Sequence, residues 1–393
     1  MEHILTLNAG SSSVKFALFE ADHADDARLR GQIEGLGATP HLIAKAGGET
    51  VADDALSPGE TADHAAALAH ILGFLEEKAG GVRPVAIGHR VVHGGPHHDA
   101  PVVLDDALLA ELAGFNPLAP LHQPHNLAAV AAARAAFPDA MQVACFDTAF
   151  HRAHPWVADT YALPQSYYEE GIRRYGFHGL SYEHAVETLQ AVSPERAGGR
   201  TIIAHLGNGA SMCATLAGRS VASSMGFTAL DGLPMGTRCG QLDPGVVLYL
   251  MTEMQMDVAA IETLLYRESG LKGLSGLSHD LRVLEAAATP ETDHAIDYFV
   301  HRIRREIGAH AAILGGVDLL AFSGGIGENA ARIRRRVCEN MEWLGIEIDA
   351  VRNANCDERI STDSSAVEVR IVRADEERVI ANHCRRFLSP DPS

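Results

Sequence analysis

Residues 8–15 read N-A-G-S-S-S-V-K and lie between two runs of alternating apolar residues. That alternation predicts a β-hairpin, and its glycine and serine tip turns backbone N–H groups and hydroxyls toward one point. Such a concavity binds an anion, most often a phosphate. Lys15, just beyond the tip, adds a positive charge that can reach the same anion. An ordinary polar turn is the alternative for this stretch taken alone.

Two further glycine-rich turns strengthen the phosphate interpretation. Residues 205–211, H-L-G-N-G-A-S, lie between two predicted strands, and Gly209 matches Gly10 of the first hairpin. The repeat predicts two halves of the chain that are built alike. Residues 322–329, F-S-G-G-I-G-E-N, follow a third strand and open into a predicted helix, a pattern typical of nucleotide sites. The three turns together predict nucleotide binding.

Several charged side chains stand at strand ends or in glycine-rich loops. Arg90, in G-H-R-V-V-H-G-G, is placed to bind a carboxylate or phosphate, with a structural ion pair as the alternative. Asp147 ends an apolar strand, where a carboxylate needs a cation or hydrogen-bond donors. His178, in Y-G-F-H-G, and Arg238, in M-G-T-R-C-G, follow in later loops. These four residues supply charge beside the phosphate-type turns.

The stretch 118–127, L-A-P-L-H-Q-P-H-N-L, predicts a rigid loop that leads into a helix. Asn126 or His125 is expected near the helix cap. For His122 and His125 we favour polar contacts to the backbone over metal ligation, because the sequence shows no zinc-type spacing.

Composition narrows the class of protein. A chain of 393 residues exceeds one hydrophobic core, so two domains are expected. The net charge of −19 argues against nucleic-acid and membrane-surface partners, which would repel it. Six cysteines without C-x-x-C pairs, no secretion signal and no long apolar run predict a cytoplasmic protein.

Strands and helices interleave along the chain, which predicts an α/β fold. The likeliest domain boundary follows Asp147, and residues 45–61 are expected to be a loose peripheral segment. The predicted strands are 3–8, 13–20, 28–35, 84–88, 140–147, 200–206, 211–217, 219–225, 317–322 and 367–373. The predicted helices are 62–79, 104–113, 125–136, 181–192, 244–255, 257–267, 279–288, 293–314 and 328–343.

These motifs, with F-D-T-A-F-H and S-M-G-F-T, occur in the order found in the acetate kinase family, which the chain resembles almost end to end. The resemblance implies the actin-like ATPase fold, with two duplicated α/β domains and ATP in the cleft between them. It implies an N-terminal domain of 1–148 with the segment 376–393, and a nucleotide-binding and dimerisation domain of 149–375. It also implies a homodimer and reversible magnesium-dependent phosphoryl transfer from ATP to acetate, with manganese as a possible substitute.

The resemblance also assigns roles residue by residue. Asp147, His178 and Arg238 match catalytic positions; Arg90 matches the substrate-carboxylate arginine; and Val92, Leu121 and Phe177 match the pocket for the substrate methyl group. Asn8 and Glu376 match metal positions, with Glu377 as the adjacent alternative. The positions matching nucleotide or phosphate contacts are Ser11, Ser13, Lys15, His205, Leu206, Gly207, Asn208, Gly209, Asp280, Leu281, Arg282, Gly324, Gly325, Ile326, Gly327 and Glu328.

The chain departs from the family pattern at two informative places. Ala229 stands where proline is common, which predicts a wider methyl pocket and a propionate or mixed acyl kinase as the alternative activity. Gln123 stands where the family often has asparagine. A sugar or polyol kinase of the same fold, and a non-catalytic ATP-driven interaction protein, are more distant alternatives. For Asp147 we expect a role in orienting the metal complex or its water, because a carboxylate nucleophile is already ionised at pH 7 and needs no general base.

Overall fold

The structure is a computed structural model that describes residues 2–10, 13–22, 26–36, 38–80, 83–120 and 122–389. The chain divides into two compact units. Unit 1 consists of Met1–Arg152 and Asp375–Ser393, and unit 2 consists of Ala153–Ala374. The boundaries expected from the sequence, after residues 148 and 375, lie next to this division. The dimerisation role expected for the second domain stays a prediction.

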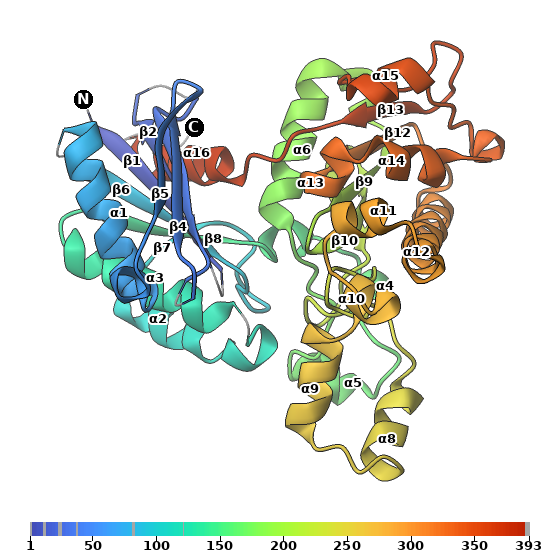
Figure 1. The fold of residues 1–393 in the computed structure, drawn as a ribbon, viewed down its shortest axis with the longest axis horizontal. Coiled ribbons are helices and arrows are strands. Elements are labelled where there is room, and N and C mark those ends of the chain that lie inside the picture. The colour runs from blue at the N-terminus through green and yellow to red at the C-terminus, as the bar shows by residue number, and fades with distance from the viewer. Residues whose placement is uncertain are drawn as a thin grey trace. The chain divides into compact units, whose positions relative to one another are not determined.

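Unit 1 is built on one eight-stranded sheet with the order β5-β4-β3-β2-β1-β6-β8-β7. The pairs β1/β6 and β6/β8 are parallel, and the other neighbours are antiparallel. The strands are β1 (His3–Ala9), β2 (Ser13–Glu20), β3 (Leu29–Glu34), β4 (His41–Ala46), β5 (Glu49–Ala55), β6 (Pro84–Val91), β7 (Val102–Val103) and β8 (Met141–Phe146). Figure 1 shows them in blue to teal.

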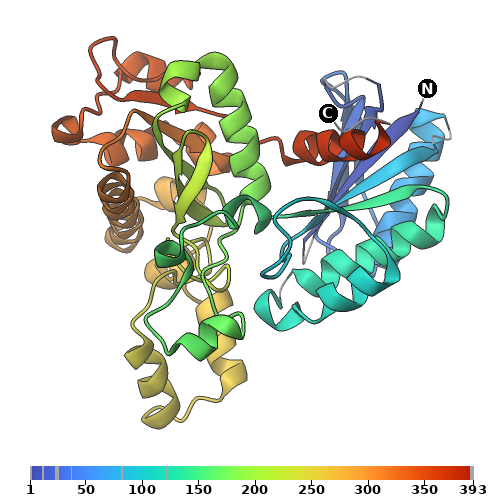
Figure 2. The same ribbon diagram turned by 180° about the vertical axis from the view of Figure 1, so that it is seen from behind.

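Helices cover both faces of this sheet. On one face α1 (His64–Ala79) and α3 (Gln123–Ala136) enclose the main core, which includes Ile87 of β6. The next residue, Gly88, points to the opposite face, because side chains alternate along a strand. There α16 (Glu376–Leu388) lies against the sheet (Figure 2). It packs so closely that a Cβ on Gly88 would lie 2.3 Å from Ile380 Cγ2. The C-terminal helix is thereby fixed to the strands that end at the site.

Two sequence expectations for unit 1 were wrong. Residues 45–61 are not loose, because β4 and β5 pair as an antiparallel edge hairpin and a 3-10 turn (Pro58–Thr61) follows. In β5 only Ala52 is buried, so the strand carries no apolar alternation that sequence reasoning could detect. The helix α16 was missed as well. The end of the chain after Ser389, expected to be disordered, lies outside the described residues.

Unit 2 repeats the central pattern of unit 1. Its sheet has the order β11-β10-β9-β12-β13, with an antiparallel hairpin β9/β10 and the parallel pairs β9/β12 and β12/β13. The same arrangement occurs in β3-β2-β1-β6-β8. The strands are β9 (Arg200–Leu206), β10 (Ala210–Leu216), β11 (Arg219–Ser223), β12 (Leu319–Ser323) and β13 (Glu368–Ile371). The duplication expected from the two glycine hairpins is confirmed.

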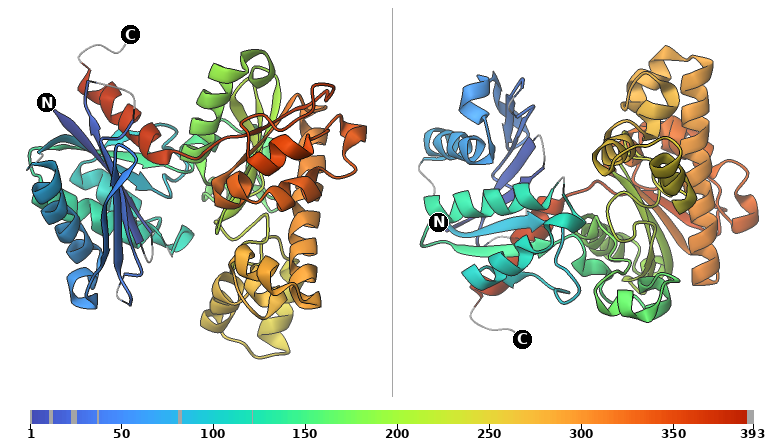
Figure 3. Two further views of the ribbon diagram at one scale, coloured as in Figure 1. Left: turned by 45° about the horizontal axis from the view of Figure 1, so that its top comes forward. Right: turned by 90° about the horizontal axis from the view of Figure 1, so that it is seen from below.

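The long helix α12 (Pro290–Leu314) packs against β9 and β10 (Figure 3). It begins with a Thr289 capping box and ends at Gly315 in the left-handed conformation. The predicted helix 328–343 is divided, because the backbone leaves helical geometry at Ala330. The remaining helices are α2 (Asp106–Ala113), α4 (Trp156–Asp159), α5 (Gln165–Glu169), α6 (Gly179–Val192), α7 (Pro194–Ala197), α8 (Pro244–Thr252), α9 (Val258–Arg267), α10 (Gly270–Ser275), α11 (Leu281–Ala287), α13 (Gly324–Asn329), α14 (Ala331–Cys338) and α15 (Ala350–Asn355). None of the helices in the described ranges has the length and apolarity to cross a bilayer.

Candidate functional site

The predicted first hairpin is present in unit 1. β1 pairs with β2 in a register that sets Asn8 opposite Lys15. The Gly10 N–H donates to the Ser13 carbonyl oxygen at 2.8 Å and closes the turn. Ser11, expected to contact phosphate, lies outside the described residues. Because directly opposed side chains share a face of the sheet, the register brings two predicted site residues together.

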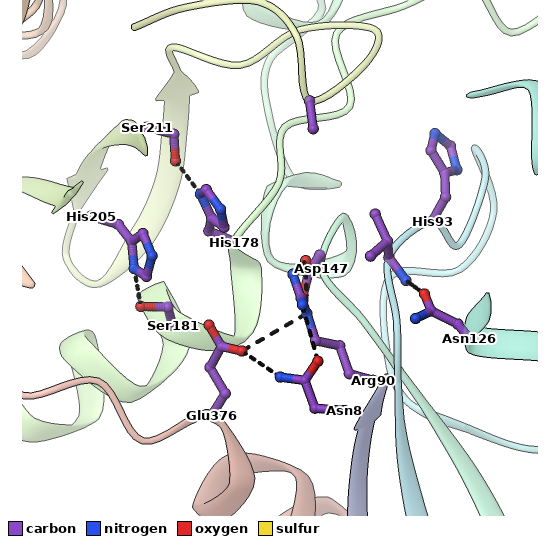
Figure 4. A network of polar contacts seen from close by, with 12 residues as sticks. Asn8, Arg90, His93, Asn126, Asp147, His178, Ser181, His205, Ser211 and Glu376 are labelled. Carbon is purple, nitrogen blue, oxygen red and sulfur yellow. Dashed lines mark hydrogen bonds and ion pairs between the residues drawn. The ribbon is translucent and has the colours of Figure 1, made fainter. Parts of the chain in front are cut away.

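Arg90, at the end of β6, is the centre of a buried polar network (Figure 4). Its Nε donates to Asp147 Oδ1 at 3.0 Å, and its Nη2 donates to Asp147 Oδ2 at 2.5 Å. Its Nη1 donates to Asn8 Oδ1 at 3.1 Å. Asp147 is 1% exposed, so the fork-shaped ion pair supplies the cation that a buried carboxylate requires.

The electrostatics of this network keep Arg90 charged. Burial alone would lower the pKa of the guanidinium, but the carboxylates of Asp147 and Glu376 raise it above its usual value overall. A guanidinium has five N–H donors, and the contacts to Asp147 and Asn8 use three of them. One N–H on Nη1 and one on Nη2 therefore remain for a further acceptor at the end of the side chain.

Glu376 rather than its neighbour belongs to this network. The Asn8 Nδ2 donates to Glu376 Oε2 at 3.3 Å, and Arg90 Nε lies 3.8 Å from the same oxygen. Glu377 instead lines a cavity with Lys15 on the outer face of β2 and β3. Burial and the charge of Glu376 raise the pKa of Glu377, while Lys15 opposes the shift.

Two site oxygens therefore have the chemistry of a metal site. The Asn8 amide oxygen and the Glu376 carboxylate are hard oxygen donors, and the hydrogen bond between the two side chains keeps them adjacent. Magnesium at phosphates is usually held by one or two protein oxygens together with phosphate oxygens and water. Among the residues that the structure describes, no group of three or more His, Cys, Asp or Glu side chains could hold a metal. The donor set fits a metal that is shared with a phosphate ligand.

The backbone of residues 92–95, which follows Arg90, is held by side chains for which the sequence predicted no such role. Gln123 accepts from His93 N and donates to His93 O, each at 3.0 Å, and Thr148 accepts from Gly94 N at 3.0 Å. Asn126 accepts from Val92 N at 3.0 Å. Helix α3 begins at residue 123 with His122 at its N-cap, so His125 and Asn126 lie in the first turn, near the cap as expected. The hydrophilic residue types within an otherwise apolar helix were the available signal.

The second hairpin, in unit 2, carries a different set of polar contacts (Figure 4). His178 precedes α6 in the left-handed conformation, with φ 59°. Its Nδ1 lies 2.8 Å from Ser211 Oγ, which also bonds the Tyr182 hydroxyl at 2.5 Å. The His178 ring stacks on His205 with the centroids 4.4 Å apart. A Cβ on Gly209 would come within 3.1 Å of His178 Nε2, which explains the glycine.

The structure brings three predicted nucleotide segments together around one cavity of unit 2. The cavity has a volume of about 580 Å³. Its predicted lining residues are Gly207, Asn208, Asp280, Leu281, Arg282, Gly325 and Ile326. His279, Glu285, Asn329 and Ala330 also line it and were not predicted. The sequence segments meet because β9 and β12 are parallel neighbours whose carboxyl ends share one edge of the sheet.

Some predicted nucleotide residues do not line this cavity. Leu206 is fully buried in the sheet, and Gly324 fits under its carbonyl only because it has no Cβ. The Glu328 carboxylate accepts from the backbone N–H of Ala374 at 2.9 Å. Gly327 and Glu328 offer their carbonyl oxygens to the buried guanidinium of Arg334. The contacts of these residues support the fold of the glycine-rich segment and are not directed into the cavity.

Arg238 also lies in unit 2, on the glycine-rich loop 225–240. Its Nη1 donates to the Ala229 carbonyl oxygen at 2.9 Å. Gly270 lies against this loop, and a Cβ there would be 2.1 Å from the Met235 carbonyl oxygen. Of the expected methyl pocket, Val92 is buried in unit 1 and Phe177 is buried in unit 2. Leu121 lies outside the described residues, so the pocket stays a prediction.

Comparisons with known proteins agree with this geometry. The model of the acetokinase family matches residues 3–382. The chain is 54% identical to an acetate kinase of Methylocella silvestris, with 98% of each chain covered. It is 51% identical to one of Nitrobacter hamburgensis, with 99% of this chain and 96% of the relative covered.

Solved structures of the same family have the same fold. A crystal structure of Porphyromonas gingivalis acetate kinase matches with a TM-score of 0.87 and 37% identity, covering 99% of this chain and all of that one. A propionate kinase from Francisella tularensis matches with a TM-score of 0.91 and 34% identity over 98% of this chain and all of that one. The expected actin-like α/β fold is confirmed. The chain belongs to the acetokinase family and is a kinase that uses ATP or ADP and a divalent metal.

Proposed function

We propose that the protein transfers the γ-phosphoryl group of ATP to acetate, giving acetyl phosphate and ADP, with Mg²⁺ as the metal and in both directions. The observation that carries the proposal is the guanidinium of Arg90. Its hydrogen bonds to Asp147 and Asn8 leave two N–H groups for a substrate, beside the two oxygen ligands that we propose for the metal, Asn8 and Glu376. Asn8 contacts both Arg90 and Glu376. An arginine fork is suited to a carboxylate substrate, and oxygen ligands are suited to the metal of a nucleotide.

The acid binds at the free end of Arg90, with Val92 beside its methyl group. Carboxylic acids of this kind titrate near about 4, so the nucleophile is ionised at pH 7 and needs no general base. One acetate oxygen attacks the γ-phosphorus, and the bond from that phosphorus to the β,γ-bridging oxygen breaks as ADP leaves. Asp147 already accepts two N–H groups of Arg90, which favours a role in holding the arginine and the metal complex over proton abstraction.

Asn8 and Glu376 hold Mg²⁺, and Mn²⁺ has the same oxygen preference. The metal neutralises charge on the phosphates when it is bound. The cavity of unit 2 holds the nucleoside, with Asp280, Leu281 and Arg282 on one wall and Gly325 and Ile326 on another. Ser11, Ser13 and Lys15 at the first tip, and His205 to Gly209 at the second, are the phosphate contacts.

His178 and Arg238 stabilise the transferring phosphoryl group. Phosphoryl transfer spreads charge over three equatorial oxygens, so catalysis depends on positioned donors and cations. His178 is fixed from one side by Ser211 and from another by the His205 ring, which supports such a role. Arg238 is oriented by the carbonyl of Ala229. The strained backbone of His178 is typical of a residue held for function.

A homodimer and a cytoplasmic location are part of the proposal. The helices α8 and α9 of unit 2 expose an apolar surface that a second copy can cover. Leu248 is 63% exposed, Tyr249 58% and Val258 71%, although each is a large apolar side chain. Clustered exposure of this kind marks interaction surfaces. All six cysteines are free thiols, as is usual in a reducing compartment.

The deciding experiment is an assay of acyl phosphate, trapped as the hydroxamate, with straight-chain acids of one to four carbons and ATP. We expect magnesium-dependent product with acetate, and none with glycerol or glucose as acceptor. ATP consumption that is independent of any carboxylic acid contradicts the proposal. Dilution-dependent sedimentation tests the dimer separately.

A mixed acetate and propionate kinase is the second candidate, and Ala229 favours it. The alanine contributes the carbonyl that orients Arg238 but lacks a proline ring. Relatives at 40–54% identity are named acetate kinase, which favours acetate as the better acid. One methylene is worth about 1–3 kcal/mol of discrimination, so we expect a propionate kcat/KM roughly 10- to 100-fold below that of acetate. A thousandfold gap excludes the mixed activity.

A further inference from the structure

We infer that Asn126 is a positioning residue that fixes the first hairpin tip relative to the segment carrying Arg90. The inference rests on the proposed function for the roles of these two segments. The Asn126 side chain is 2% exposed. It lies on α3, and its hydrogen bonds to the two segments go to backbone atoms, not to side chains.

One amide joins the two segments directly. The Asn126 Nδ2 donates to the Ala9 carbonyl oxygen at 2.5 Å, and its Oδ1 accepts from the Val92 N–H at 3.0 Å (Figure 4 shows the second bond). A carbonyl can only accept and a backbone N–H can only donate, so the orientation of the amide is fixed. Ala9 follows Asn8, and Val92 lies two residues after Arg90.

The amide acts where the sheet itself no longer joins the strands. The parallel register of β1 with β6 runs from His3 to Leu7, which pairs with His89. Beyond these residues the strands carry Asn8 and Arg90, whose side chains form the site. Parallel strands commonly part at their carboxyl ends where a ligand binds. In place of hydrogen bonds between the strands, Asn126 makes one hydrogen bond to Ala9 and one to Val92, just after β6.

Neighbouring side chains hold the same two segments singly. His64, on α1, donates from Nε2 to the Gly10 carbonyl oxygen at 2.6 Å, and its ring stacks on His125. Gln123, one turn before Asn126, holds only His93 of the Arg90 segment and Leu112. Within these hydrogen bonds, Asn126 alone reaches both segments. A shift of about 1 Å between reacting groups can cost on the order of 10²-fold in rate, so this bridge sets the rate.

The test is Asn126→Asp, which keeps the acceptor for Val92 and loses the donor to Ala9 when ionised. At pH 8 we expect kcat about 30- to 100-fold below wild type, with ADP affinity, which depends on the unit 2 cavity, within twofold. Burial raises the pKa of a carboxyl group, and its protonated form is a donor again. The ratio of variant to wild-type kcat should therefore rise as the pH is lowered to 6.

The comparison with wild type at each pH removes the pH dependence that both enzymes share, and the histidines that surround Asn126 are His64, His93 and His125. Gln123→Ala is the matched control on the same helix, and we expect it to raise the KM for acetate while the KM for MgATP stays within twofold. A kcat ratio that stays within threefold of one, or that does not change with pH, overturns the inference. The absence of acyl phosphate formation by wild type instead overturns the proposed function.

A second measurement needs no variant. Hydrogen exchange at the Val92 amide of the wild-type protein should slow at least threefold when a magnesium complex of a non-hydrolysable ATP analogue binds, because that ligand engages the tip that Asn126 joins to Val92. Unchanged exchange at Val92, with the analogue shown to be bound by calorimetry, contradicts the bridge. This readout stands even if Asn126→Asp does not fold or acetate is not the substrate.

Discussion

The hairpins β1/β2 and β9/β10 have the same strand arrangement but different side-chain chemistry around them. In unit 1 the strands next to the hairpin β1/β2 present an ionic network of Asn8, Arg90, Asp147 and Glu376. In unit 2 the hairpin β9/β10 is surrounded by hydroxyl and imidazole groups, with Ser211 as the shared partner. Duplication supplied two glycine-containing hairpins, and the different residues around each hairpin favour the different ligands that we propose for them.

The difference follows from what each ligand requires. A small carboxylate and a metal need charges held at fixed positions, and unit 1 balances the partly buried Arg90 with the buried carboxylate of Asp147 and the partly buried one of Glu376. A nucleotide brings its own charge and needs close backbone approach. The glycines at the tip and around the cavity of unit 2 suit the nucleotide that we propose there. We therefore expect variants in unit 1 to alter use of the acid and variants in unit 2 to alter phosphoryl transfer.

Arg238→Ala is the largest expected effect and the strongest test of the comparison. We propose Arg238 as the cation at the transferring phosphoryl group, and arginines in that role are worth about 10³–10⁵ in rate. We expect kcat to fall by that factor with little change in the KM for ATP, measured by initial rates. Arg200→Ala is the control, because Arg200 pairs with Asp318 at the start of β9, away from the tip. A change confined to KM contradicts the role.

Arg90→Lys should reduce kcat/KM for acetate about 10²-fold, because lysine keeps the charge but cannot bind Asp147 and a substrate carboxylate through two edges. ADP affinity, measured by calorimetry, should stay within twofold because the nucleotide cavity is in unit 2. If ADP binding weakens as much as acetate use, the assignment of the acid to unit 1 is wrong.

The strand that carries Arg90 also makes unit 1 sensitive to acid. Burial lowers the pKa of His89 to about 4, below its ordinary 6.5, although its hydrogen bond to Gln142 opposes the shift. The unfolded chain therefore takes up the proton first as the pH falls. The free energy of unfolding should decrease between about pH 6.5 and 4 by on the order of 3 kcal/mol.

Urea unfolding at several pH values measures this loss. His89→Gln should remove the His89 share of the pH dependence over that window and leave the share of His93, because burial lowers the pKa of His93 to about 3. His97→Gln, at an exposed position, should leave the slope unchanged. A slope in His89→Gln equal to that of wild type assigns the acid sensitivity to other groups.

Local features of the site were predictable from the sequence, and distant ones were not. The glycine and serine tips could be found because the turn and its residues are consecutive, and their repeat predicted the duplicated sheets. The bonds of Asn126 to Ala9 and Val92 span 117 and 34 residues, so no short pattern records them.

The edge strand β5 and the C-terminal helix α16 also escaped prediction. β5 is solvent-exposed except at Ala52, and α16 is rich in charged residues, with buried side chains such as Val379 and Cys384 spaced among them. Hydrophobic periodicity detects elements by the apolar residues they bury, and β5 buries only one. In α16 the buried Val379, Ile380 and Cys384 have helical spacing, so the sequence held a signal that the prediction overlooked. Helix α16 matters for the proposed function because its first residue is Glu376.

The smallest expected effect tests whether the uncharged hydrogen bonds of unit 2 orient their site residue, as the ion pairs of unit 1 do. Ser211→Ala removes the bond to His178 Nδ1 and leaves the Tyr182 hydroxyl with one partner fewer. A hydrogen bond of this kind is worth about 1 kcal/mol net, so kcat should fall roughly five- to tenfold. Thr188→Ala is the control, because it removes a different hydroxyl, one that faces His184 within α6. An equal loss in both variants, or a loss of acetate affinity instead of kcat, would mean that the hydroxyl supports the fold and does not orient His178.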